Sequence, residues 1–245
     1  MDTDMMIDNE FHDDYDEWLQ CLNSLWCGKK VDVIKRIIKM FTSPKEIVLD
    51  PFMGDGTTVE VANTLDRKAI GFEINEKYIS AVIERLEGHR DSYEIIEDSC
   101  INITKYLYEE SVDLCIATPP WLNMYHRNHA GHKKQNDFTL LHKNIGKTSS
   151  YSCYLSNLAK AFSEVYEVLK PNKMCIVIVM DMRKRDRLYP LHIDLANIMA
   201  DIGFIIDDLI IWDSRKEHST LKAVSNSCVY RTNIVHEYIC IFKKE

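Results

Sequence analysis

The sequence predicts an α/β fold built on a mostly parallel sheet with helices on both faces. Short, almost continuously apolar runs alternate with segments whose apolar residues recur at helical spacing. Strands that are apolar throughout are typical of parallel sheets buried on both sides. The chain has 245 residues, of which 46% are hydrophobic, so it can bury one such core. We therefore expect a single main domain.

The elements follow one another in strand and helix order. The apolar runs predict strands at 46–50, 68–73, 93–96, 112–117, 174–181, 204–212 and 236–242. Helical spacing predicts helices at 57–67, 75–87, 153–169 and 190–202; Leu155, Leu158 and Phe162 illustrate it in the third. Ligands of such sheets bind outside the carboxyl ends of the strands. The residues that follow each strand are therefore the candidates for a site.

The first strand ends in the glycine-containing loop "DPFMGDGTT", Asp50 to Thr58. Gly54 and Gly56 permit backbone conformations and a close approach of a ligand that other residues do not. Thr57 and Thr58 can cap the helix that follows, whose N-terminus faces the loop. The loop lacks both the G-K-[ST] ending of a phosphate loop and the G-x-G-x-x-G pattern of dinucleotide enzymes. It predicts a site where a small ligand lies against bare backbone.

The next two strands each end in an acidic residue. Glu73 follows Gly54 by 19 residues and ends the second strand, where a carboxylate can hold both hydroxyls of a ribose. Asp98 follows the third strand, where it can accept a hydrogen bond from an adenine amino group. Each feature alone is more often structural. In this order, at the ends of three successive strands, they predict a site for an adenosine-containing ligand.

Five segments together resemble the amino-methylating DNA methyltransferases, which modify N4 of cytosine or N6 of adenine. They are "DPFMGDGTT", "AIGFEIN", "TPPW", "GFIIDDLIIW" and "HEYICIFKK", within a resemblance that runs from about Lys29 to Lys244. The resemblance implies a doubly wound, mostly parallel seven-stranded sheet of the class I S-adenosylmethionine-dependent methyltransferase type, with the last strand antiparallel. It also implies S-adenosyl-L-methionine as the cofactor.

The resemblance also assigns the cofactor-binding residues. Asp50, Pro51, Phe52, Gly54 and Gly56 would line the methionine end, Glu73 would hold the ribose and Asp98 the adenine. The segment "GKKVDVIKRIIKMFTSP" resembles the family's cofactor-closing motif, although Lys30 is followed here by Val31 and not by proline. The full candidate set is Lys30, Asp50, Pro51, Phe52, Gly54, Gly56, Thr57, Thr58, Glu73, Ile74, Asp98 and Ser99.

The catalytic candidates are Thr118, Pro119, Pro120 and Trp121, which directly follow the fourth strand. An exocyclic amino group is a poor nucleophile because its lone pair is delocalised into the ring. Acceptors near its hydrogens, the Thr118 side chain and the Pro119 carbonyl, would localise that lone pair. The prolines fix φ and restrict the residue before each of them, so the carbonyls keep a set direction. Trp121 offers an aromatic face to a base flipped out of the duplex.

The residue before the two prolines favours one substrate. In the family, threonine or serine there is usual for cytosine N4 enzymes and aspartate or asparagine for adenine N6 enzymes, with crossovers. We therefore expect cytosine N4, with adenine N6, an RNA base amino group and a non-catalytic binding subunit as alternatives. Methylation at cytosine C5 needs a thiolate after the fourth strand, whereas Cys115 lies inside that strand.

The charge is divided unevenly along the chain. The net charge is −8, yet residues 1–20 hold eight acidic and no basic side chains, which leaves the remainder formally neutral. We expect 1–28 to form an acidic N-terminal extension and 29–245 a single methyltransferase domain with a substrate-binding loop at 122–150. Basic residues in that loop and in "RKRDR" predict phosphate contacts, with a solvated surface as the alternative. These residues are Arg127, Lys133, Lys134, Lys143, Lys147, Arg183, Lys184 and Arg185.

Further features bear on partners and location. No segment has the length of a membrane span and the start shows no signal pattern, so we expect a cytoplasmic protein, nucleoid-associated in a prokaryote. His126, His129 and His132 have no cysteine or carboxylate at ligand spacing, so we expect no metal. The eight cysteines are scattered and read as reduced thiols. Too few residues separate the two motifs for a recognition domain, so DNA would be read by loops, a homodimer or another subunit.

Overall fold

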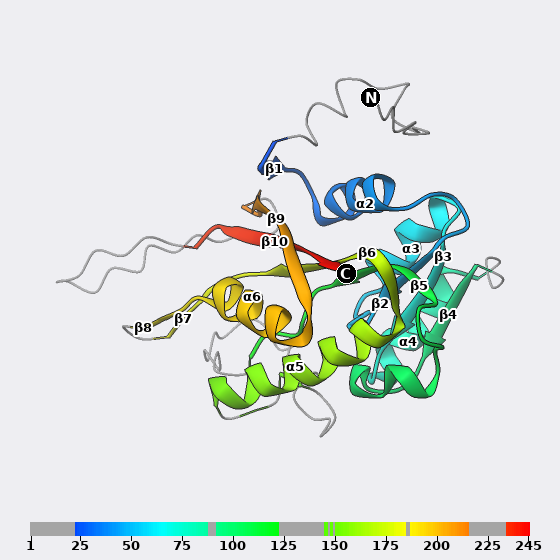
Figure 1. Cartoon of the computed structure of the whole chain (residues 1–245). Coiled ribbons are helices and arrows are strands. Elements are labelled where there is room, and N and C mark those ends of the chain that lie inside the picture. Colours follow the sequence, from blue (N-terminus) through cyan, green and yellow to red (C-terminus); the bar gives the residue numbers. More distant parts are fainter. Residues whose placement is uncertain are drawn as a thin grey trace, which may run out of the picture.

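The computed structural model describes residues 23–87, 92–122, 145–146, 148, 150–184, 187–215 and 234–245. Their main sheet (Figure 1) contains β1 (Leu25–Cys27), β2 (Ile47–Asp50), β3 (Lys68–Phe72), β4 (Tyr93–Ile96), β5 (Val112–Ala117), β6 (Leu169–Val179), β9 (Phe204–Asp213) and β10 (His236–Lys244). A separate hairpin contains β7 (Met182–Lys184) and β8 (Arg187–Tyr189). The helices are α2 (Lys30–Phe41), α3 (Thr57–Thr64), α4 (Glu76–Arg85), α5 (Tyr151–Val168), α6 (Leu191–Ile202) and the 3-10 helix η1 (Cys100–Lys105).

The main sheet has the strand order β1-β9-β10-β6-β5-β2-β3-β4. Neighbouring strands are parallel except at β10, which runs antiparallel to both β6 and β9. The predicted doubly wound sheet with an antiparallel last strand is thus confirmed. The predicted strands correspond to β2, β3, β4, β5, β6, β9 and β10.

One predicted boundary is wrong, because β1 adds an eighth strand from inside the proposed extension. Trp26 is 1% exposed, and its strand pairs in parallel with the end of β9, next to Trp212. A strand of three residues is too short to show a period in the sequence. The sheet therefore begins at Leu25, inside the segment assigned to the extension.

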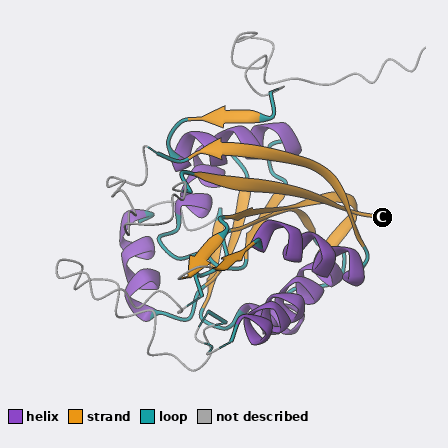
Figure 2. Cartoon of the chain, turned by 90° about the vertical axis from the view of Figure 1, so that its left-hand side faces the viewer, coloured by secondary structure: helices purple, strands orange, loops and turns teal. Residues whose placement is uncertain are grey.

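Helices cover both faces of the sheet (Figures 1 and 2). α5 and α6 pack on one face in a core that includes Phe162 and Leu195, and α2, α3 and α4 contribute to the core of the other face. The central strand β5 is buried at all six positions, with Cys115 in the first core and Ile116 in the second. Burial on both faces explains why "VDLCIA" is almost continuously apolar.

Local side chains set several helix boundaries. Asn75 accepts a hydrogen bond from the Lys77 N–H at the start of α4, and Ser150 accepts one from the Cys153 N–H at the start of α5. Helix α3 ends at Thr64, three residues before the predicted end. Directly after it, the buried Arg67 guanidinium donates to the Thr42 and Leu65 carbonyls. These bonds fix the connection to β3.

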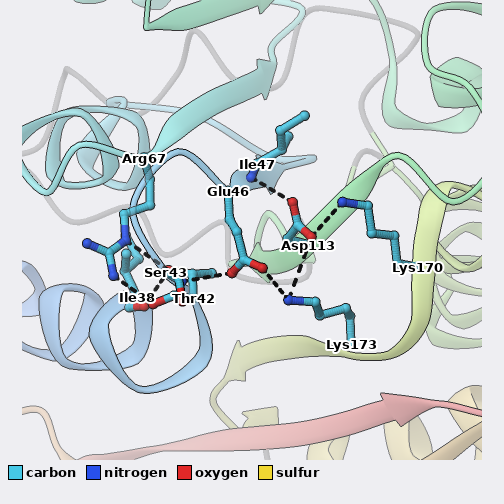
Figure 3. A network of polar contacts seen from close by, with 9 residues as sticks. All are labelled: Ile38, Thr42, Ser43, Glu46, Ile47, Arg67, Asp113, Lys170 and Lys173. Carbon is cyan, nitrogen blue, oxygen red and sulfur yellow. Dashed lines mark hydrogen bonds and ion pairs between the residues drawn. The ribbon is translucent and has the colours of Figure 1, made fainter. Parts of the chain in front are cut away.

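A polar network holds together the amino-terminal ends of three strands (Figure 3). The buried Asp113 of β5 accepts from the Ile47 N–H of β2 at 3.0 Å and from Lys170 Nζ of β6 at 2.7 Å. Lys173 Nζ lies 2.6 Å from Glu46 Oε1 and 3.6 Å from Asp113 Oδ1. This network lies at the edge of the sheet opposite the carboxyl ends of the strands. Within the described ranges, no helix has the length and apolar character needed to cross a bilayer.

Candidate active site

A cavity of about 310 Å³ lies outside the carboxyl ends of β2, β3, β4 and β5. The residue stretches after these four strands form most of its wall, as expected for a parallel sheet of this kind. Its lining residues are Lys30, Pro51, Phe52, Met53, Gly54, Asp55, Phe72, Glu73, Ile74, Tyr78, Asp98, Ser99, Cys100, Thr118, Pro119, Pro120, Trp121 and Ile145. The cavity thus brings the predicted cofactor loop and the predicted catalytic motif together.

The two glycines of the loop have different structural roles. Gly54 has φ of +52°, and a Cβ there would meet only the Phe52 carbonyl oxygen, at 3.7 Å, so bare backbone faces the cavity. Gly56 has φ of +77° at the start of α3, and a Cβ there would lie 2.5 Å from Val82 Cγ2 of α4. Gly56 therefore allows α3 and α4 to pack closely and does not line the cavity.

Glu73 joins the loops after β2 and β3. It is 8% exposed; Oε2 accepts from the Gly54 N–H at 2.9 Å, and Oε1 accepts from the Ile74 and Asn75 N–H groups at 2.8 and 2.9 Å. A carboxylate offers about four acceptor positions. Three are used by backbone donors, which leaves about one for a ligand hydroxyl. The carboxylate is thus held rigidly at the cavity wall.

Asp98 is also held by several donors. Its Oδ1 accepts from the Ser99 N–H at 2.7 Å, and its Oδ2 accepts from Asn102 Nδ2 and from the Tyr106 hydroxyl, both at 3.0 Å. The Tyr106 ring meets Phe72 edge to face, with centroids 5.8 Å apart. Phe72 lines the cavity and directly precedes Glu73, so an aromatic residue before the strand-end carboxylate is the sequence signal for this part of the wall.

Asp50 lies behind the loop, not on the cavity wall. It is 5% exposed, and its Oδ1 accepts from the Phe52 N–H at 3.0 Å. Burial raises the pKa of Asp50 to about 6, although the Thr58 hydroxyl, the Phe52 N–H and the nearby Lys30 all lower it. Asp50 therefore shapes the turn from the end of β2 and brings a negative charge close to the site.

Asp55 and Lys30 form the charged rim of the cavity. Lys30 Nζ lies 3.9 Å from Asp55 Oδ1, which also accepts from the Thr57 hydroxyl at 2.8 Å. Burial acts to raise the pKa of Asp55, but Lys30, Thr57 and Arg85 together hold it below its ordinary value. Lys30 is the first residue of α2, so this helix places its cation beside the glycine loop.

The segment after β5 presents its residues in graded exposure. Pro119 is buried, Thr118 and Pro120 are half-buried, and Trp121 is 53% exposed. The Tyr154 hydroxyl of α5 donates to the Pro120 carbonyl at 3.1 Å, and Tyr154 itself is buried. This bond fixes the direction of the backbone between the prolines and Trp121. An aromatic side chain exposed at the mouth of a cavity is suited to stack on a planar ligand.

Most candidate residues meet at the cavity, but four do not line it. Lys30, Pro51, Phe52, Gly54, Glu73, Ile74, Asp98, Ser99 and the four motif residues do; Asp50, Gly56, Thr57 and Thr58 do not. The reason is local: Asp50 and Thr58 are buried beneath the turn, and Thr57 bonds to Asp55. Lining residues that sequence reasoning missed are Met53, Asp55, Phe72, Tyr78, Cys100 and Ile145.

Most of the predicted phosphate-binding residues lie outside the described residues. They are Arg127, Lys133, Lys134, Lys143, Lys147 and Arg185. The histidines His126, His129 and His132 also lie outside the described residues. Arg183 and Lys184 belong to β7, which begins three residues after β6 ends and therefore near the carboxyl edge of the sheet. Among the described side chains, no three of His, Cys, Asp or Glu gather as metal ligands would.

The fold and the cavity define a class I methyltransferase architecture. A proposed rRNA methylase of Clostridium thermocellum superposes with a TM-score of 0.55 at 16% identity, covering 88% of this chain and 98% of that one. A proposed methyltransferase of Streptococcus mutans, crystallised with SAH, superposes with a TM-score of 0.53 at 15% identity, again over 88% and 98%. At these identities the superpositions show the fold alone.

Sequence comparison shows the family. A family model described as DNA methylase, of the N6 and N4 type, matches residues 27–84 and 112–245. The chain belongs to this family of amino-methylating DNA methyltransferases, whose cofactor is S-adenosyl-L-methionine.

Curated relatives match over short segments. The type II methyltransferase M.BglII of Bacillus subtilis is 45% identical over 60 residues, which is 24% of this chain and 17% of that protein. The DNA adenine methyltransferase YhdJ of Escherichia coli K12 is 49% identical over 55 residues, 22% of this chain and 19% of that protein. The matches thus span about a fifth of the length of these relatives.

Proposed function

We propose that this chain transfers a methyl group from S-adenosyl-L-methionine to an exocyclic amino group of a flipped base in DNA, with N4 of cytosine as the favoured acceptor. One observation carries the proposal: Thr118, Pro119, Pro120 and Trp121 line the same cavity as Gly54, Glu73 and Asp98. A bound adenosine-type ligand and a base held by the motif would therefore share one space.

The residues present fit the cofactor. The open backbone at Gly54, the anchored carboxylates of Glu73 and Asp98 and the apolar wall at Phe52 and Phe72 supply hydrogen-bond acceptors and contact area around one cavity. When bound, the cofactor supplies a methyl group on a positively charged sulfur. The carboxylates of Asp50 and Asp55 lie behind and beside the glycine loop, which favours a cationic ligand there.

The motif residues would act on the base. The Thr118 hydroxyl and the Pro119 carbonyl would accept from the amino hydrogens, which keeps the nitrogen lone pair out of the ring. The Pro120 carbonyl already accepts from Tyr154, so it serves to hold the segment in place. Trp121, exposed at the cavity, would stack on the base.

The identity of Thr118 favours cytosine N4, because a neutral hydroxyl supplies the acceptor without a buried charge. One comparison favours adenine N6 as the second candidate, since the relative YhdJ is named a DNA adenine methyltransferase. DNA contacts from the basic residues of 122–150 and of the β7–β8 hairpin belong to the same proposal, as does a homodimer or second subunit that reads the sequence. The alternatives that the experiment must exclude are methylation of an RNA base and a subunit that binds without catalysis.

The deciding experiment is expression in a host that lacks DNA methylation. Host DNA and RNA are digested to nucleosides and analysed by mass spectrometry, beside a Trp121→Ala variant and a Tyr108→Ala control. Tyr108 is 87% exposed and does not line the cavity, so its loss should change nothing. We expect N4-methylcytosine from the wild type and from Tyr108→Ala, and far less from Trp121→Ala. N6-methyladenine would select the second candidate, methylated RNA would redirect the substrate, and no new nucleoside with intact cofactor binding would indicate a binding subunit.

A further inference from the structure

A second, smaller cavity lies on the other side of the catalytic motif. Its volume is about 20 Å³, which is room for about one water molecule. Thr118, Pro119 and Trp121 line both cavities, so the motif forms the wall between them. The remaining lining residues of the small cavity are Tyr154, Ile178, Val179, Met180, Met182, Leu191 and Glu237. Glu237 is the single ionisable carboxylate among these lining residues.

Thr118 and Glu237 line the same small cavity from the two sides of β6. Ala117 of β5 is level with Val177 of β6, and Val179 of β6 is level with Tyr238 of β10. One residue beyond these pairs, Thr118, which follows β5, falls beside Ile178, and Glu237 of β10 falls beside Met180. The two residues are thus offset by two positions along β6. Ile116 and Ile239 belong to the same core, so Thr118 and Glu237, each two residues nearer the carboxyl edge of the sheet, continue that face.

The small cavity has the polar partners that a bound water needs. Glu237 is 9% exposed and offers carboxylate oxygens, Thr118 offers a hydroxyl, and the Tyr154 hydroxyl oxygen can accept while it donates to Pro120. A buried water is held by two to four such groups. A water in this cavity would connect the hydroxyl of the catalytic motif to the carboxylate of β10.

We propose that Glu237 is the final acceptor of the proton that the target amino group loses, reached through the Thr118 hydroxyl and one water. The proposal rests on the proposed function. Glu237 would supply the proton-accepting carboxylate that the catalytic motif lacks, because the motif has Thr118 at the position where a carboxylate could have taken the proton. Glu237 acts through other groups and is thus a positioning and proton-holding residue.

The step balances in atoms and charge. The amino nitrogen forms its bond to the methyl carbon as the S–CH3 bond breaks, with the electron pair left on sulfur. The nitrogen then carries one proton more than the product. That proton passes to the Thr118 hydroxyl, which gives its own proton to the water, and the water gives one to the Glu237 carboxylate. The protonated Glu237 loses it to solvent after turnover.

Other ionisable groups lie on the elements around this carboxylate. Asp213 lies on β9 and His236 and Tyr238 on β10, while Asp181 follows β6 and contacts His192 of α6, with Nδ1 and Oδ1 2.7 Å apart. Tyr154 of α5 lines the same cavity, and Lys30 of α2 lies at the larger one. Any of these could shape a pH profile, so the test compares variants of Glu237 itself.

The test is single-turnover methylation of DNA between pH 5 and 9 with saturating cofactor. In the wild type the rate should rise with pH through one ionisation. Glu237→Gln, which keeps the shape of the side chain, should slow transfer by about 100-fold and remove that ionisation. Glu237→Asp should restore part of the rate and the pH dependence. Calorimetry should find the affinity for S-adenosyl-L-methionine unchanged in both variants.

Asp113→Asn is the matched control, because Asp113 is also a buried carboxylate and lies at the opposite edge of the sheet. It should lower stability and leave the pH profile unchanged. A folded Glu237→Gln variant with the wild-type rate and profile would overturn the inference and leave the proposed function intact. If Glu237→Gln does not fold, a folded Glu237→Asp variant with the full wild-type rate and pH profile would overturn it, because the shorter side chain withdraws the carboxylate from the water. A wild type that binds cofactor and methylates no nucleoside would overturn both.

Discussion

Replacing Asp50 by asparagine is expected to stabilise the protein at neutral pH while weakening cofactor binding. Burial raises the pKa of Asp50 from 3.8 to about 6. A carboxyl whose pKa is raised by folding binds its proton more tightly in the folded state, so its ionisation costs stability. That cost is absent below pH 3.8 and complete above about pH 6. At 1.36 kcal/mol for each pKa unit, the difference corresponds to about 3 kcal/mol above pH 6.

Asparagine keeps the acceptor for the Phe52 N–H, which lies 3.0 Å from Asp50 Oδ1, and removes the buried charge. A gain of about 3 kcal/mol would raise the melting temperature of a chain of this size by roughly 6 to 12 °C. Affinity for the cationic cofactor should fall, because a negative charge behind the loop is lost.

The assay is thermal unfolding of the cofactor-free protein at pH 4 and pH 7.5, together with calorimetric titration of S-adenosyl-L-methionine. Glu94→Gln is the control, since Glu94 is an exposed carboxyl on β4. The stabilisation by Asp50→Asn should be present at pH 7.5 and nearly absent at pH 4. Equal effects at both pH values, or destabilisation at pH 7.5, would refute the reasoning about burial.

Three further outcomes are expected. Glu73→Gln should weaken cofactor binding by about 1–3 kcal/mol, because an amide disrupts a carboxylate that accepts from three backbone N–H groups; unchanged calorimetric affinity in the folded variant would contradict it. Asp113→Asn should cost about 2 kcal/mol in urea unfolding at pH 7. Burial acts to raise the pKa of Asp113, but the Ile47 N–H, Lys170 and Lys173 hold it below its ordinary value. The stability that the Asp113 carboxylate contributes is therefore present above the unfolded-state pKa and is lost as pH falls through the folded-state pKa. A cost of Asp113→Asn that persists at pH 2 would argue against this. Trp121→Ala should leave cofactor affinity intact while single-turnover methylation falls on the order of 100-fold, and a wild-type rate would make Trp121 a packing residue.

Much of the architecture could be read from local patterns in the chain. A strand buried on both faces, such as "VDLCIA", can be predicted from the sequence because both faces must be apolar, and all six of its residues are buried. Turn chemistry likewise marked the loop after β2, where Gly54 takes a positive φ. The order of these loops at the strand ends was sufficient to predict where the cavity would form, since parallel strands present their carboxyl ends together.

The tertiary structure decided what each residue of that loop faces. Asp50 and Glu73 are both acidic residues at strand ends, yet only Glu73 lines the cavity, because the turn after β2 folds Asp50 beneath it. The pairing of β1 with β9 and the placement of Thr118 and Glu237 on the two sides of β6, at one small cavity, depend on strand register across segments far apart in sequence. The local sequence around a residue determines the apolar periodicity of its element and its turn preference. Its partners across the sheet are chosen by the packing of the whole core, which no local pattern records.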